Sequence, residues 1–276
     1  MKYIRRGIVM LFLASVALWA AVYVLTVRDK DQTPPQITGT TDEIQVSVGA
    51  TDEELLAGLT AFDDRDGDIT DKIRVGTHSK FIHKGSCEVQ YYVFDSSYNV
   101  AQFSRRVTYT DYESPRFILS SPLIYEVDST VSVMSRVSAK DDLDGDISGK
   151  IKIVSSNVNE AKEGVYSADL EVTNEYGDVC ELEVPVHIVE KGFFDEEAPQ
   201  IVLNSYLVYL KKGEELNPEQ YLKKVVEPDE SEGNLDDVQI ENGVDTSKEG
   251  IYEVTYTYES PNGKSTVSYL IVAVTE

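Results

Sequence analysis

Runs in which apolar and polar residues alternate recur along most of the chain, and turns of polar residues separate them. A period of two is typical of a β-strand with one buried face. Only residues 52–59 and 218–225 have a composition that allows a helical turn or two. Beyond the N-terminal segment the pattern predicts an all-β chain. The runs richest in β-branched and aromatic residues are residues 87–94, 165–173, 179–189, 251–258 and 265–274.

The N-terminal segment breaks this pattern. The 21 residues from 7 to 27 carry no charge. At about 1.5 Å per residue, a helix of that length spans roughly 31 Å and matches a hydrocarbon core of about 30 Å. Lys2, Arg5 and Arg6 precede the run, whereas basic and acidic residues offset one another after it. This bias predicts a single-pass cell-membrane protein with a cytoplasmic stub (1–6), a transmembrane signal anchor (7–27) and an extracellular remainder.

A cleaved signal peptide is the alternative for the same segment. Its apolar region usually runs for about 7 to 15 residues before a cleavage site with two small residues. Ala20 and Ala21 offer a poor site of that kind, because Trp19 occupies a position that should be small. The length of the apolar run therefore favours an uncleaved anchor.

One segment of the chain occurs twice. Residues 61–73 read AFDDRDGDITDKI, and residues 139–151 read AKDDLDGDISGKI. A proline followed by a short apolar stretch recurs with a similar period, at Pro35, Pro115 and Pro199. Such self-similarity indicates a repeat protein. We predict three modules, called module one, two and three, over residues 33–111, 114–190 and 198–276.

Six or seven short strands in about 80 residues fit a β-sandwich of immunoglobulin type. The chain resembles the bacterial Ig-like domains found in tandem on surface proteins, a family that includes the Ig-like domain of certain pesticidal crystal proteins. Residues 35–37 match its proline-x-isoleucine opening, and residues 61–70 and 139–148 match its central A-x-D-x-x-D-G-D-I-T motif. The resemblance implies three tandem Ig-like β-sandwich modules that serve adhesion, ligand display or spacing, without catalytic activity.

Module three departs from the central motif. Residues 225–237 keep its acidity but lose the D-G-D-I sequence, whereas residues 243–252 resemble the family closely. The resemblance therefore implies the same fold for module three. Any property that depends on the acidic motif is expected in the first two modules.

The acidic motif is the candidate for site chemistry, because it crowds four carboxylates into six residues. Crowded carboxylates are favourable when a cation screens them, and Ca²⁺ is a hard ion that takes about six to eight oxygen ligands. Junction residues such as Asp111 and Asp195 could supply more ligands. The predicted Ca²⁺ ligands are Asp63, Asp64, Asp66 and Asp68 in module one and Asp141, Asp142, Asp144 and Asp146 in module two.

The alternative for the motif is an Asp-Gly turn whose side chains cap their own backbone and otherwise face solvent. The motif is not an EF-hand, because that loop needs glycine at its sixth and glutamate at its twelfth position. The sequence leaves both interpretations of the motif open.

An enzymatic function finds no support in the sequence. His78, His83 and His187 are scattered without the spacing of metal ligands. The chain contains no G-x-S-x-G motif, phosphate-binding loop or zinc pattern. We predict a protein that is not an enzyme and has no cofactor other than Ca²⁺.

The formal net charge of -24 makes nucleic acid and anionic lipid surfaces poor partners for the modules. The expected partner is a protein or a cell-envelope glycan, and sandwich modules can bind glycans by stacking them on exposed aromatic rings. The alternative function is an extracellular sensory or accessory subunit of a membrane complex. The tyrosines expected to be accessible are Tyr98, Tyr112, Tyr125 and Tyr176.

Overall fold

The computed structural model describes residues 2–28, 30–195 and 197–276. Helix α1 (Lys2–Arg28) opens the chain. Its span Tyr3–Val24 is long and apolar enough to cross a membrane, and no part of that span is buried. A helix satisfies its own backbone hydrogen bonds, which is what allows a segment to enter hydrocarbon. Signal anchors and signal sequences share these properties.

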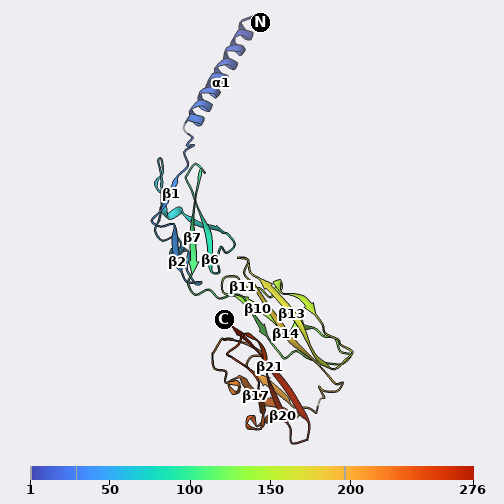
Figure 1. The fold of residues 1–276 in the computed structure, drawn as a ribbon. Coiled ribbons are helices and arrows are strands. Elements are labelled where there is room, and N and C mark those ends of the chain that lie inside the picture. The colour runs from blue at the N-terminus through green and yellow to red at the C-terminus, as the bar shows by residue number, and fades with distance from the viewer. Residues whose placement is uncertain (1, 29, 196) are drawn as a thin grey trace. The chain divides into compact units, whose positions relative to one another are not determined.

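Module one consists of seven strands, with one helical turn, α2 (Asp52–Leu56), and one 3₁₀ turn, η1 (Thr70–Lys72). The strands are β1 (Gln36–Gly39), β2 (Glu43–Val46), β3 (Leu59–Asp63), β4 (Gly67–Asp68), β5 (Arg74–His78), β6 (Ser86–Phe94) and β7 (Val100–Tyr109). They form a three-stranded sheet of order β1-β3-β4 and a four-stranded sheet of order β2-β7-β6-β5. The neighbouring strands β6 and β7 lie side by side in Figure 1. β2 runs parallel to β7, and the other neighbouring strands are antiparallel.

Module two repeats this topology, with sheets of order β11-β10-β8 and β12-β13-β14-β9 and a parallel pairing of β9 with β14. Its 3₁₀ turns are η2 (Val133–Ser135) and η3 (Ser148–Lys150). Its strands are β8 (Arg116–Leu119), β9 (Ile124–Glu126), β10 (Val137–Asp141), β11 (Gly145–Asp146), β12 (Lys152–Ser156), β13 (Gly164–Thr173) and β14 (Val179–Val189).

Module three has the same topology again, with sheets of order β15-β17-β18 and β16-β21-β20-β19 and a parallel pairing of β16 with β21. Its 3₁₀ turns are η4 (Pro218–Tyr221) and η5 (Leu235–Asp237). Its strands are β15 (Gln200–Leu203), β16 (Leu207–Lys211), β17 (Leu222–Val226), β18 (Glu232–Gly233), β19 (Gln239–Asn242), β20 (Gly250–Glu259) and β21 (Ser265–Thr275).

The alternation of apolar and polar residues in the sequence corresponds to an alternation of buried and exposed side chains along the strands. In β6, Cys87, Val89, Tyr91 and Val93 are all buried, whereas Phe94 is exposed. The buried side chains face the partner sheet, so each module is a sandwich with its core between two sheets. The prediction of an all-β fold with three tandem Ig-like sandwiches after an N-terminal helix is confirmed.

The chain divides into two compact units, Met1–Thr110 and Asp111–Glu276. Modules two and three lie in the second unit, and one apolar cluster of buried residues runs from Phe117 through Val274. The backbone N–H of Phe117 donates a hydrogen bond to the hydroxyl of Tyr209 over 3.0 Å. The sandwiches of modules two and three therefore share a core within one unit.

The two stretches expected to form helical turns behave differently. In residues 52–59, α2 begins with a capping box in which Thr51 and Glu54 each accept a hydrogen bond from the other's backbone N–H. In residues 218–225, only η4 is helical, and the strand β17 begins at Leu222. The expected turn is shorter there because β17 pairs with β15, and sheet pairing outweighs weak local helix propensity.

Candidate metal centre

The acidic motif forms a tight hairpin between β3 and β4. Asp63 ends β3, and its Oδ1 accepts hydrogen bonds from the backbone N–H groups of Arg65 and Asp66 over 2.9 and 2.8 Å. Gly67 follows with a φ of 76°, a conformation that favours glycine. The first aspartate of the motif therefore uses one carboxylate oxygen to hold the turn.

The later aspartates of the motif bind donors of the protein itself. Asp66 accepts hydrogen bonds from the backbone N–H and the hydroxyl of Ser96 over 2.5 and 2.7 Å. These bonds lower the pKa of the Asp66 carboxyl. Asp68 accepts a bond of 3.0 Å from the backbone N–H of Thr70, and the Thr70 hydroxyl and N–H hold its pKa low. Asp64 is exposed to solvent.

Module two uses its motif in the same way. The Oδ1 atom of Asp141 accepts from the backbone N–H of Asp144 over 2.9 Å. Asp144 accepts from the backbone N–H of Glu175 over 2.6 Å and forms an ion pair of 3.2 Å with Lys150. Asp146 accepts a hydrogen bond from the backbone N–H of Ser148, and Asp142 is exposed. The motif therefore forms the same type of turn in both modules.

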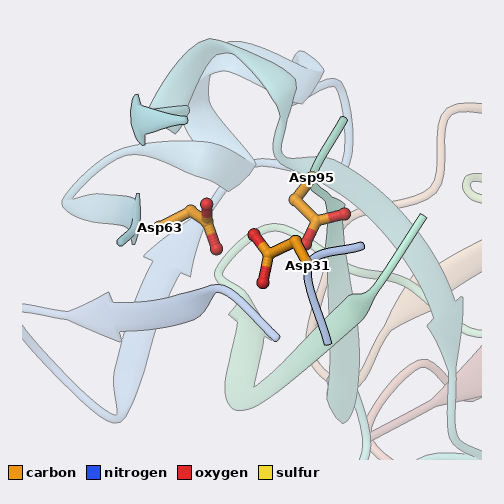
Figure 2. Close-up of side chains that lie close together, drawn as sticks. All are labelled: Asp31, Asp63 and Asp95. Atoms are coloured by element: carbon orange, nitrogen blue, oxygen red, sulfur yellow. The ribbon is translucent and has the colours of Figure 1, made fainter. Parts of the chain in front are cut away.

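Among the described residues, one predicted ligand belongs to a group of three carboxylates whose oxygens lie close enough to share an ion. Asp63 converges with Asp31 and Asp95 from two other segments (Figure 2). One carboxylate oxygen of each residue lies within 4.8 Å of the other two. We call these three residues the carboxylate cluster. Asp31 lies ahead of module one, Asp63 ends β3, and Asp95 follows β6.

Local turns hold the other two members of the cluster in place. The Oδ1 of Asp95 accepts hydrogen bonds of 2.8 Å from the backbone N–H groups of Ser97 and Asn99. The Asn99 amide donates to Asp95 Oδ2 over 2.7 Å and to the backbone carbonyl of Asp31 over 3.2 Å. The Oδ1 of Asp31 accepts from the N–H of Thr33 over 2.9 Å. The cluster is therefore positioned by backbone donors on three segments.

The cluster concentrates negative charge in a largely buried place. Asp63 and Asp95 are only 2% and 5% exposed, and Asp31 is partly buried. The Oδ2 atom of Asp63 is buried and accepts no hydrogen bond from the described residues. Among those residues, no lysine or arginine forms an ion pair with any member of the cluster.

In module two, the equivalent carboxylate receives hydrogen bonds from two nearby side chains. The Oδ2 of Asp141 accepts hydrogen bonds from the Asn174 amide over 3.0 Å and the Tyr112 hydroxyl over 3.3 Å. Asn174 opens the same turn as Asp95, because each bonds through its backbone N–H to the carbonyl four residues on. Burial and the hydrogen bond to Asp178 raise the pKa of Tyr112, so its hydroxyl keeps the proton that it donates.

Module three replaces the cluster in another way. Asp195, which lies four residues before Pro199 as Asp31 lies before Pro35, forms an ion pair of 2.9 Å with Lys264. The turn after β20 begins at Ser260, whose hydroxyl donates to Glu227 over 2.6 Å. A lysine and two hydroxyls, from Ser260 and Tyr258, thus supply the donors near this turn.

Asp31 and Asp95 were not among the site residues predicted from the sequence. Two weak signals were present, since Asp95 opens the polar turn after a clear strand and Asp31 precedes the opening proline of module one. The prediction of calcium ligands at Asp64, Asp66, Asp68, Asp142, Asp144 and Asp146 stays a prediction. Asp64 and Asp142 are exposed, and the partners of the other four are backbone, hydroxyl and lysine donors.

The tyrosines proposed for glycan contact differ in exposure. Tyr98 is 86% exposed, as expected, but Tyr125 is only 5% exposed, so the expectation for Tyr125 is wrong. Tyr125 lies in β9, which pairs with β14, and the guanidinium of Arg136 lies 4.2 Å from its ring centroid. Tyr112 is bound to Asp141 and Asp178.

Comparison with known proteins gives one family match and one curated relative. The family model for the bacterial Ig-like domain (group 3) matches residues 209–269. The pesticidal crystal protein Cry22Aa of Bacillus thuringiensis is 32% identical over 243 residues, which cover 84% of this chain and 32% of that protein. The chain thus spans about a third of the length of this relative.

Similar solved structures include the CBM51-2 and INT domains of Clostridium perfringens ZmpB in complex with GlcNAc, at 19% identity and a TM-score of 0.23, covering 54% of this chain and 26% of that chain. They also include the protocadherin GammaB4 extracellular domain, at 13% identity and a TM-score of 0.20, with a match that covers 88% of this chain and 49% of that chain. Likenesses of this strength add nothing to the fold described above. The chain is a tandem array of three Ig-like β-sandwich modules, and residues 209–269 of module three match the family model of the bacterial Ig-like domain.

Proposed function

We propose that this chain is a membrane-anchored bacterial surface protein that holds its Ig-like modules outside the cell for adhesion, ligand display or spacing. The observation that carries the proposal is α1, whose span Tyr3–Val24 is unburied and apolar. An apolar surface of that length is unfavourable in water but favourable in a bilayer. The basic residues ahead of it favour an N-terminus in the cytoplasm.

The charge and fold of the modules support the same proposal. A protein of net charge -24 is repelled by anionic surfaces and stays soluble in a crowded exterior. Ig-like sandwiches are compact and present loops at both ends for contact with a partner. The proposed role involves no catalysis, in keeping with a sequence that holds no G-x-S-x-G motif, phosphate-binding loop or zinc pattern.

The anchor is tested with the full chain carrying an epitope after Glu276. Protease added to intact cells should remove the epitope, and a carbonate wash should leave the chain with the membranes. Mass spectrometry should find a mature chain that still contains residues 1–21. A soluble chain that begins near Val22 would show a cleaved signal peptide and would refute the anchor.

Adhesion and spacing are then separated on whole cells. One strain carries the full chain, and a second strain carries an unrelated pair of Ig-like modules of equal length in place of residues 111–276. Adhesion or ligand display through modules two and three predicts that the exchange abolishes attachment to the partner surface. Spacing predicts that it leaves cell behaviour unchanged.

A further inference from the structure

We propose that the carboxylate cluster of Asp31, Asp63 and Asp95 binds one Ca²⁺ ion. The proposal goes beyond display at the membrane, because the site belongs to the folded module and does not depend on how the chain is anchored. It also differs from the predicted sites in the acidic motifs, since it uses one motif residue in module one and none in module two.

The first argument is the buried oxygen of Asp63. Its side chain is 98% buried, its Oδ1 already accepts two backbone N–H groups, and its Oδ2 accepts none from the described residues. An ionised carboxylate oxygen without a partner is costly in such a place. Asp31 and Asp95 add two more carboxylates within 4.8 Å. A bound cation would neutralise this charge and occupy the free position on Oδ2.

The second argument comes from the other modules, which serve as internal comparisons. Module two has the same Asp-x-x-Asp-Gly hairpin, but the Asn174 amide and Tyr112 hydroxyl donate to Asp141 Oδ2. Module three places the Lys264 ammonium on Asp195. In both modules, a side chain of the protein supplies the hydrogen-bond donor or the positive charge that the carboxylate needs. Module one instead has Asp95 at the place of Asn174, Gln32 at the place of Tyr112 and Asn99 at the place of Lys264. None of these three residues donates a hydrogen bond to Asp63 Oδ2, so a cation from solution would take the role of the missing donor.

The donor set favours Ca²⁺ among the common ions. Carboxylate oxygens are ligands of hard cations, and Ca²⁺ takes them at about 2.3–2.6 Å in flexible geometry. Two ligands of one such ion lie at most about 5 Å apart, so oxygens within 4.8 Å can share it without rearrangement of the backbone. Mg²⁺ demands near-ideal octahedral geometry at about 2.0–2.1 Å. Three oxygens held by three different backbone turns suit the more tolerant ion.

The proposed ion would join segments that are distant in sequence. Asp31 lies in the short stretch between α1, which ends at Arg28, and the first strand of module one. Asp63 and Asp95 lie at the ends of β3 and β6, which belong to different sheets. Ion binding would therefore fasten the segment that follows the membrane helix to both sheets of module one.

The test is a calorimetric titration of CaCl₂ into the chelator-stripped full chain in detergent, at physiological salt. Four matched Asp→Asn variants are compared with the wild type, because asparagine keeps one side-chain oxygen that can accept the hydrogen bonds of the turn and replaces the other oxygen by an uncharged NH2 group. Asp63→Asn and Asp95→Asn alter the cluster. Asp141→Asn alters the equivalent residue of module two, and Asp66→Asn alters the motif outside the cluster. Circular dichroism of each variant checks that the strands are retained.

The expected result is one Ca²⁺ per chain for the wild type, Asp66→Asn and Asp141→Asn, and loss of that binding in Asp63→Asn and Asp95→Asn. The absence of binding to the wild type overturns the proposal. So does binding that survives in folded Asp63→Asn, or that is lost in Asp66→Asn, which would place the ion in the acidic motif. MgCl₂ binding as tightly as CaCl₂ overturns the choice of ion. None of these results bears on membrane topology, so failure here leaves the proposed function standing.

Discussion

The contact between Tyr209 and Phe117 allows a sharp test of the shared core of modules two and three. The Tyr209 hydroxyl accepts a hydrogen bond of 3.0 Å from the backbone N–H of Phe117, which lies on β8. Phe117 is 1% exposed, and Tyr209 lies on β16 of module three. The substitution Tyr209→Phe removes this acceptor and keeps the ring, over which the Arg116 guanidinium lies 5.3 Å from the centroid.

The expected loss follows from the unmade hydrogen bond. Leaving a buried donor without an acceptor costs about 1–3 kcal/mol. Because modules two and three form one compact unit, both should lose this free energy of unfolding together. For a unit of this size, about 2 kcal/mol lowers the melting midpoint by roughly 4–8 °C.

Hydrogen exchange of the full chain, followed by mass spectrometry, measures both modules at once. Amides of β13 and β14 in module two and of β20 and β21 in module three should lose the same free energy of protection. Tyr252→Phe is the matched control, because its hydroxyl bonds to the Lys248 carbonyl at an exposed position where water can replace it. That variant should change stability by less than about 0.5 kcal/mol. Faster exchange confined to module three would refute the shared unit.

Three further predictions follow from single contacts. Asp95→Asn should raise the melting midpoint of the chain in chelator, because it copies Asn174 and removes a like-charge repulsion on the order of 3 kcal/mol per pair; a lower midpoint would contradict this. The Lys248 ammonium and Ser247 hydroxyl lower the pKa of Asp245 to about 2. Since the unfolded value is about 3.9, this pairing stabilises the fold above about pH 4 and is lost as the pH falls toward about 2. Urea midpoints of the wild type and Lys248→Met should therefore converge over that range, and a constant difference would be inconsistent with it. Leu13→Arg places a charge in the middle of α1 at a cost of about 3 kcal/mol, so more of the chain should leave carbonate-washed membranes than with Leu13→Ala.

The fold could be predicted from the sequence because its evidence is local and repeated. The two copies of the acidic motif, the three opening prolines and the alternation in residues 251–258 each mark the same unit. Module three lost the motif but kept the topology, since sheets of the same order form around β17 and β20. The sandwich fold is therefore determined by the alternation of apolar and polar residues along the strands, and it does not require the acidic motif.

The site could be predicted only in part. Asp63 and Asp141 occupy identical motif positions, and their sequences give no sign that one is satisfied by side chains and the other is not. The difference arises from Asp95 and Asn174, more than thirty residues further along each module, and from Asp31 ahead of the first strand. Such groups meet only when the two sheets pack. Local crowding of carboxylates therefore pointed to Asp63 but gave no indication of Asp31 and Asp95, the other two members of the cluster.

The most direct test of the difference between module one and its repeats is a crystal of the chain grown with CaCl₂ and measured for anomalous scattering from calcium. We expect one peak about 2.3–2.6 Å from oxygens of Asp31, Asp63 and Asp95, and none beside Asp141 and Asn174. A map without a peak at the cluster, or with peaks of equal height at Asp66 and Asp144, would contradict it.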